Sequence, residues 1–152
     1  MAELEGRPTT AQREVELRLG MDLQLPERYL PEASLRLSFY KRLAACDDDE
    51  SLSALLDEMA DRYGPAPAQV DDLARAQRVR MAARRAGMAS VARRARKWRL
   101  RLDSTVNPPP GLAEALSGWS GAQVSQAGEI TLPTPDGPDI SELLRFLEQL
   151  AS

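Results

Sequence analysis

Residues 48–65 read DDESLSALLDEMADRYGP, and this stretch predicts the most regular helix of the chain. Asp47 to Glu50 supply a cap and negative charge at the helix start, where both are favourable. Gly64 and Pro65 end the helix. Apolar or aromatic side chains recur between these limits at helical spacing, at Leu52, Leu55, Leu56, Met59, Ala60 and Tyr63. One face of this helix is therefore expected to be buried and the other exposed.

Two further helices flank this one. Leu35, Phe39 and Leu43 follow a helical period and predict a helix over residues 34–46, with Ser34 as its cap. Pro67 can open another helix that runs to Gly87. The short connection at residues 64–67 predicts that the second and third helices form a hairpin.

Strand patterns lie on both sides of the three helices. Residues 15–19 alternate apolar and charged side chains, which predicts a strand that Leu23 and Leu25 extend. Residues 97–102 alternate cations with Trp98, Leu100 and Leu102, which predicts a strand with one cationic face. Further along we expect a short helix at 112–119, a short strand at 130–132 and a closing helix at 140–150, capped by Asp139 and Glu142. The predicted fold class is α+β, a helix-dominated single domain with a small β-sheet.

Composition excludes many kinds of chemistry. The chain has 152 residues, no histidine and one cysteine, Cys46, so neither a zinc site nor a histidine-based nucleophile is expected. The sequence contains neither of the glycine-rich phosphate-binding patterns GxxxxGK[ST] and GxGxxG. There is also no apolar run long enough to span a bilayer. We therefore expect a cytoplasmic protein that is not an enzyme and uses no cofactor, metal or membrane.

Charge is strongly segregated along the chain. Residues 47–74 contain nine acidic residues and one basic residue, whereas residues 75–101 contain eleven basic residues and no acidic one. Residues 102–152 are acidic again. Such blocks indicate charged partners unless they pair within the fold.

The basic segment 75–101 has two interpretations. It could bind the phosphate backbone of a nucleic acid, or its arginines could pair with the preceding acidic block. The candidate nucleic-acid contacts are Arg84, Arg85, Arg93, Arg94, Arg96, Lys97, Arg99 and Arg101.

The acidic pair Glu58 and Asp61 gives a more specific signal. The two residues are three apart in a predicted helix and therefore share a face. Exposed carboxylates at this spacing suit a partner that carries arginine, because charge-assisted hydrogen bonds are directional. The alternative is an ordinary solvated helix face.

The segment RLSFYKRLA at residues 36–44 resembles the C-terminal domain of bacterial transcription-repair coupling factors. The VEL stretch at 15–17, Leu30-Pro31 and the 55–65 stretch ending DRYGP resemble the same domain in the same order. The likeness is specific over about residues 14–90. The AELEG stretch at 2–6 resembles the end of the translocase module that precedes this domain. Residues 1–13 are therefore expected to be a flexible lead-in, and residues 14–152 the regulatory domain.

This resemblance implies a regulatory role. Full-length coupling factors are DNA-translocating ATPases that displace stalled RNA polymerase and recruit UvrA through a UvrB-like module. Their C-terminal domain is not catalytic, and it docks on that module and masks the UvrA-binding surface. Carried over to this chain, the docking residues would be Glu58, Asp61, Arg62 and Tyr63. The expected partners are the UvrB-like module directly, and UvrA and RNA polymerase indirectly. The alternative is a nucleic-acid-binding module that uses residues 75–101, so contact with DNA is left open.

Overall fold

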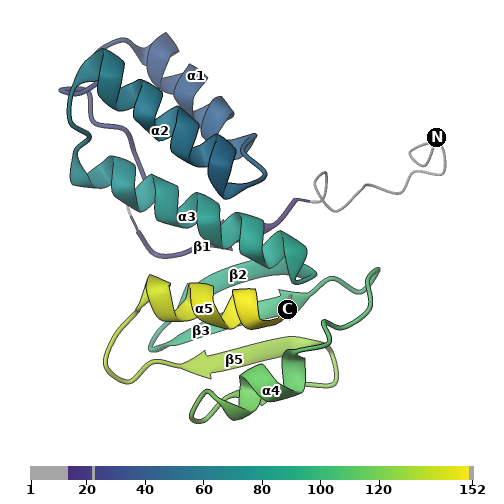
Figure 1. Cartoon of the computed structure of the whole chain (residues 1–152). Helices are drawn as coiled ribbons and strands as arrows, with labels where there is room; N and C mark the ends of the chain where they lie inside the picture. Colours follow the sequence, from purple (N-terminus) through teal and green to yellow (C-terminus); the bar gives the residue numbers. More distant parts are fainter. Residues whose placement is uncertain (1–13, 22, 151–152) are drawn as a thin grey trace, which may run out of the picture. The chain divides into compact units, whose positions relative to one another are not determined.

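The computed structural model describes residues 14–21 and 23–150 (Figure 1). The predicted lead-in at 1–13 lies outside the described residues. The described part contains five helices and a five-stranded sheet, which confirms the predicted α+β class. Contacts divide the chain into two compact units. One is Met21–Met81, here called the helical unit, and the other, the sheet unit, joins the chain up to Gly20 with Ala82–Ser152.

The helical unit contains α1 (Ala33–Ala44), α2 (Asp49–Tyr63) and the larger part of α3 (Ala68–Arg85). All three helices match the sequence prediction within a few residues. Their apolar faces meet in one core, formed by Leu25, Leu30, Phe39, Leu43, Cys46, Leu52, Leu55, Met59, Val70 and Met81. The buried amide of Gln77 ties α3 to the chain before α2, because its Nε2 donates to the Cys46 carbonyl at 2.9 Å.

The two ends of α2 follow the prediction. The Asp48 carboxylate accepts a 2.7 Å hydrogen bond from the Ser51 backbone N–H, and this contact lowers the pKa of Asp48. Gly64 ends the helix with a φ of 90°. The predicted cap of α1 was wrong, since the helix begins at Ala33 and Ser34 falls inside its first turn. The guanidinium of Arg36 instead donates to carbonyls of the preceding turn.

The sheet unit is built on a five-stranded sheet in the order β1-β2-β3-β5-β4. Only the β1–β2 pair is parallel, and the other neighbouring pairs are antiparallel. The strands are β1 (Glu16–Arg18), β2 (Met88–Arg94), β3 (Lys97–Leu102), β4 (Gln123–Val124) and β5 (Glu129–Pro133). The predicted strands at 97–102 and 130–132 are confirmed.

Two strand predictions need correction. The first strand covers three residues and does not continue to Leu23 and Leu25, because Gly20 turns the chain with a φ of 74°. Leu25 belongs instead to the core of the helical unit. Strand β2 was not predicted, since its small residues give no alternation of large apolar side chains. Its pairing with β3 on one side and β1 on the other defines it as a strand.

Two helices complete the sheet unit, α4 (Leu112–Ser117) and α5 (Ile140–Leu150). Figure 1 shows α5 lying across the sheet. Buried side chains of the sheet and of α5 form its core, namely Met88, Val91, Trp98, Leu100, Ile130, Leu132, Leu143, Phe146, Leu147 and Leu150. Asp139 caps α5 as predicted, accepting from the backbone N–H groups of Ser141 and Glu142. In the described chain, no helix combines the length and apolarity needed to cross a membrane.

Gly64→Ala should lower the free energy of unfolding by about 1–2 kcal/mol, because an L side chain is strained at positive φ. A Cβ at position 64 would meet no atom within 4 Å, so crowding adds nothing to this cost. Urea denaturation measures the change. Gly118→Ala is the matched control, since Gly118 also follows a helix but has a φ of −84°. Equal effects of the two substitutions would contradict this explanation.

Candidate docking surface

Glu58, the first member of the acidic pair of α2, lies next to the last turn of α1. Both carboxylate oxygens of Glu58 accept hydrogen bonds from the Arg42 guanidinium, each at 2.7 Å. This two-point contact fixes the orientation of both planar groups. Arg42 also lies over the Phe39 ring, 5.3 Å from its centroid. Glu58 is therefore already bound within the chain.

These contacts set the electrostatics of the pair. The hydrogen bonds from Arg42 hold the pKa of the Glu58 carboxyl below its ordinary value, and desolvation opposes them. The positive charges of Arg42 and Arg62 lower it further. The same hydrogen bonds raise the pKa of the Arg42 guanidinium. Glu58 consequently stays ionised in mildly acidic conditions.

Asp61 and Arg62 are the exposed members of the predicted set. Arg62 lies 3.8 Å from Glu58, one helical turn away, and its side chain is 62% exposed. Asp61 is exposed and makes no ion pair or hydrogen bond with the described residues. Its carboxylate is thus the member of the pair that an external cation can reach.

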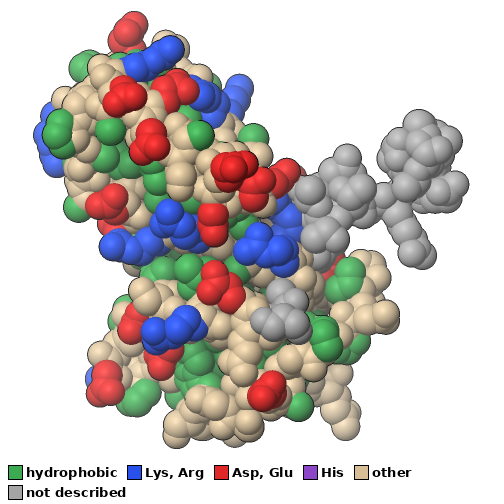
Figure 2. Space-filling view, in the orientation of Figure 1, with side chains coloured by type: hydrophobic (Ala, Val, Ile, Leu, Met, Phe, Trp, Pro, Cys, Tyr) green, Lys and Arg blue, Asp and Glu red, His purple; other side chains and the backbone are tan. Residues whose placement is uncertain are grey.

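Tyr63 has a different environment. Its ring packs edge-to-face against Phe39 and Tyr29, with centroid distances of 5.9 and 6.2 Å. Tyr29 in turn lies within hydrogen-bond distance of the Met59 and Gly64 carbonyls. Tyr63 therefore fixes the end of α2, while its partly exposed edge remains available. In Figure 2, acidic and basic side chains lie interspersed on the visible face of the helices.

The structure distributes the basic segment over several environments. Arg84 is buried, and Arg93 donates to the Thr134 hydroxyl while its guanidinium lies 5.0 Å from the Trp98 ring centroid. Arg99 pairs with Glu129 at 2.8 Å. Five of the candidate nucleic-acid contacts are exposed, namely Arg85, Arg94, Arg96, Lys97 and Arg101. Pairing with the acidic block also occurs, because Arg78 lies 3.8 Å from Asp49.

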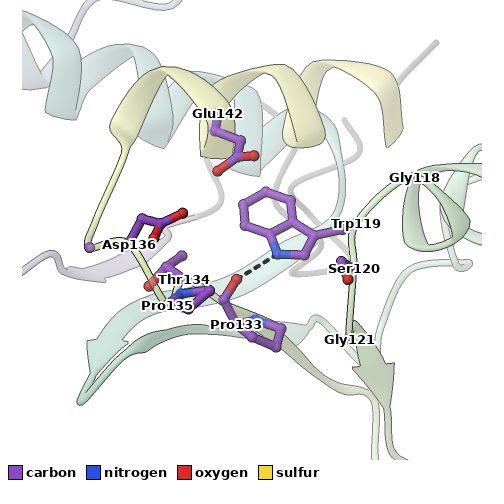
Figure 3. Close-up of a pocket in the computed structure, with 10 residues that line it drawn as sticks. Gly118, Trp119, Ser120, Gly121, Pro133, Thr134, Pro135, Asp136 and Glu142 are labelled. Carbon is purple, nitrogen blue, oxygen red and sulfur yellow. Dashed lines mark hydrogen bonds between the residues drawn. The ribbon is translucent and has the colours of Figure 1, made fainter.

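A cavity of about 540 Å³ lies in the sheet unit beside Trp119 (Figure 3). The indole N–H donates to the Pro133 carbonyl at 2.8 Å, and the ring packs edge-to-face on Phe146. Asp136 in the loop after β5 and Glu142 on α5 also line the cavity. Its polar side chains are the hydroxyls of Ser120 and Thr134 and the carboxylates of Asp136 and Glu142. Within residues 14–21 and 23–150, no three acidic or cysteine side chains are placed to hold a metal ion.

The comparisons with known proteins agree with the fold of this chain. The family model of the TRCF domain matches residues 19–111. The chain belongs to the TRCF domain family. The match extends beyond residue 90, where the likeness seen in the sequence became weak. A crystal structure of the C-terminal domain of a transcription-repair coupling factor has the same fold, with a TM-score of 0.79 and 22% identity, over 91% of this chain and 92% of that one.

Longer relatives of this TRCF domain are transcription-repair-coupling factors. That of Mycobacterium bovis is 38% identical over 79 residues, which is 52% of this chain and 6% of the relative. That of Escherichia coli K12 is 38% identical over 83 residues, which is 55% of this chain and 7% of the relative. The chain thus spans only a small fraction of the length of these relatives.

Sequence reasoning about the TRCF domain missed Arg42, which binds Glu58 of the acidic pair. Arg42 lies inside the RLSFYKRLA segment, but it is 16 residues from Glu58 and no local pattern links them. It also missed Arg18, which shares a sheet face with the basic strand. The alternation of residues 15–19 contained that signal, because Glu16 and Arg18 must point to the same side.

Glu58→Gln should remove a pH-dependent part of the stability. The native pKa of Glu58 is lowered, so its stabilisation is present above the unfolded value of about 4.3 and is lost as the pH falls through the lower native pKa. Urea denaturation should therefore show a destabilisation at neutral pH that shrinks below about pH 4.3. Asp61→Asn is the control, since that carboxylate has no partner among the described residues. A pH-independent effect of Glu58→Gln would show that the stabilisation does not come from the ionised Glu58 carboxylate.

Proposed function

We propose that this chain is the docking and restraining domain of a transcription-repair coupling factor. In this role it binds the UvrB-like module through the end of α2 and masks the surface that UvrA would occupy. Engagement of RNA polymerase by the whole factor would release it. The domain works by binding and carries out no reaction itself.

One observation carries this proposal. Asp61 is exposed without a partner, beside a Glu58 carboxylate that Arg42 already holds in place. We assign the direct contact with an arginine of the partner to Asp61. Glu58 then acts as a positioning residue, because it orders Arg42 and Arg62 around the contact. Tyr63 holds the same end of the helix in place through its edge-to-face contact with Phe39.

The chemistry of this surface suits a reversible restraint. Charged contacts give specificity without a large apolar area, so the closed state can be favoured by a modest free energy. A preference of about 4 kcal/mol leaves roughly one molecule in a thousand open. A competitor that binds only the open form can then shift the population.

The test is a calorimetric titration of this chain with the separately purified UvrB-like module of its parent protein. Asp61→Asn should weaken binding by about 2 kcal/mol or more, roughly 30-fold, because the partner's arginine loses its counter-charge on docking. Glu58→Gln should weaken it less. Asp71→Asn, the same change at an exposed position of α3, should leave the affinity unchanged.

Competition with UvrA and binding at high concentration also test the proposal. Bound chain should reduce the affinity of the module for UvrA, since the two surfaces overlap in the proposed mechanism. Tethering within one protein can compensate for weak binding, so the titration must extend to high micromolar concentrations. Absence of binding there, or equal losses for Asp61→Asn and Asp71→Asn, would reject the docking role.

A further inference from the structure

The face of the sheet that carries the outward side chains of β1, β2, β3 and β5 is cationic. A groove of about 240 Å³ runs over it. Its lining includes Arg18 of β1, Arg94 of β2 and both Arg99 and Arg101 of β3. Lys97 extends the same alternation by one position and is exposed. Every residue of this cationic face belongs to the sheet unit.

Two of the five cations are paired within the chain. Arg18 contacts Glu16 at 2.8 Å, and Arg99 contacts Glu129 at 2.8 Å. Arg94, Lys97 and Arg101 make no ion pair or hydrogen bond with the described residues. The hydrogen bond from Arg99 lowers the pKa of Glu129 most, desolvation opposes it, and the positive charges of Arg99, Arg101 and Lys97 lower it further. Three positive charges therefore remain for an external anion.

The arrangement of these cations favours a linear anion. Lys97, Arg99 and Arg101 follow one strand at every second residue, so they form a line of about 14 Å with even spacing. On β2 the small residues Ser90 and Ala92 pair with Arg101 and Arg99. These small side chains leave room for a ligand backbone to approach the arginines. Guanidinium groups bind phosphate oxygens at two points, which suits a phosphodiester chain.

The same face lacks the features that other ligands need. The groove lining contains no aromatic side chain, so it offers no surface for stacking bases. It also offers no apolar pocket for the anchor residue of an acidic protein. We propose that the cationic face of the sheet binds the phosphate backbone of a DNA duplex through charge, without reading its sequence. This role is independent of the α2 docking surface.

The test is fluorescence anisotropy of a labelled DNA duplex of mixed sequence, titrated with the whole chain. Three free cations predict weak binding, with a dissociation constant of the order of 10⁻⁴ M at physiological salt. They also predict a loss of affinity of about 40-fold between 50 and 200 mM salt. Duplexes of different sequence should bind equally, and a single strand should bind with a shallower salt dependence.

Variants separate the cationic face from overall charge. Lys97→Gln/Arg101→Gln should reduce the salt slope by about two. Glu16→Gln/Glu129→Gln should release Arg18 and Arg99 and increase the slope. Lys41→Gln/Arg145→Gln is the control, because both residues are exposed on helices, neither is a candidate nucleic-acid contact, and the change removes the same lysine and arginine charges. Circular dichroism verifies that each variant is folded.

Three results would overturn the proposal. One is the absence of salt-dependent binding at 50 mM salt. The second is an equal loss in the Lys97/Arg101 and Lys41/Arg145 variants, which would assign binding to net charge alone. The third is competition by polyglutamate as strong as that by unlabelled duplex, which would indicate an acidic protein instead. Failure of the calorimetric titration with the UvrB-like module would leave this inference unaffected.

Discussion

Burial of the apolar stripe of α2 determines where the charged side chains of that helix can point. Leu52, Leu55 and Met59 are buried in the helical unit, so the positions between them must face outward or flank α1. Glu58 flanks α1 and meets Arg42, whereas Asp61 is one step further around the helix and remains in solvent. The different environments of these two carboxylates thus follow from packing. The chemistry of the proposed docking surface depends on this difference between Glu58 and Asp61.

The charge blocks of the sequence become two separate surfaces in the structure. The acidic residues of α2 belong to the helical unit, and the cationic face belongs to the sheet unit. Local pairs such as Arg99 with Glu129 and Arg75 with Asp72 reduce the excess charge without removing it. Each surface keeps a few unpaired groups of one sign. A chain with a net charge of −3 can therefore present an acidic surface to a basic partner and a separate basic surface to an acidic partner.

Helical periodicity was a reliable guide in this chain, because each helix buries one side of its own sequence. Both ends of α2 were predictable because their signals are local. Asp48 caps the helix through Ser51, three residues away, and Gly64 ends it through its own backbone conformation. Strand β2 was not predictable, because pairing with distant strands defines it. The acidic pair could be found from its spacing. Its partner Arg42 could not, since a contact across 16 residues depends on how two helices pack.

Cys46 gives the helical unit a built-in chemical reporter. It is the sole cysteine of the chain, the residue is 6% exposed, and its thiol lies 3.4 Å from the Arg42 carbonyl. A thiol reagent can therefore modify it only when the packing between α1 and α2 opens. The labelling rate measures that opening in the same helices that carry Arg42 and Glu58. Partners that hold these helices closed would slow the modification, even though they never touch the sulfur atom.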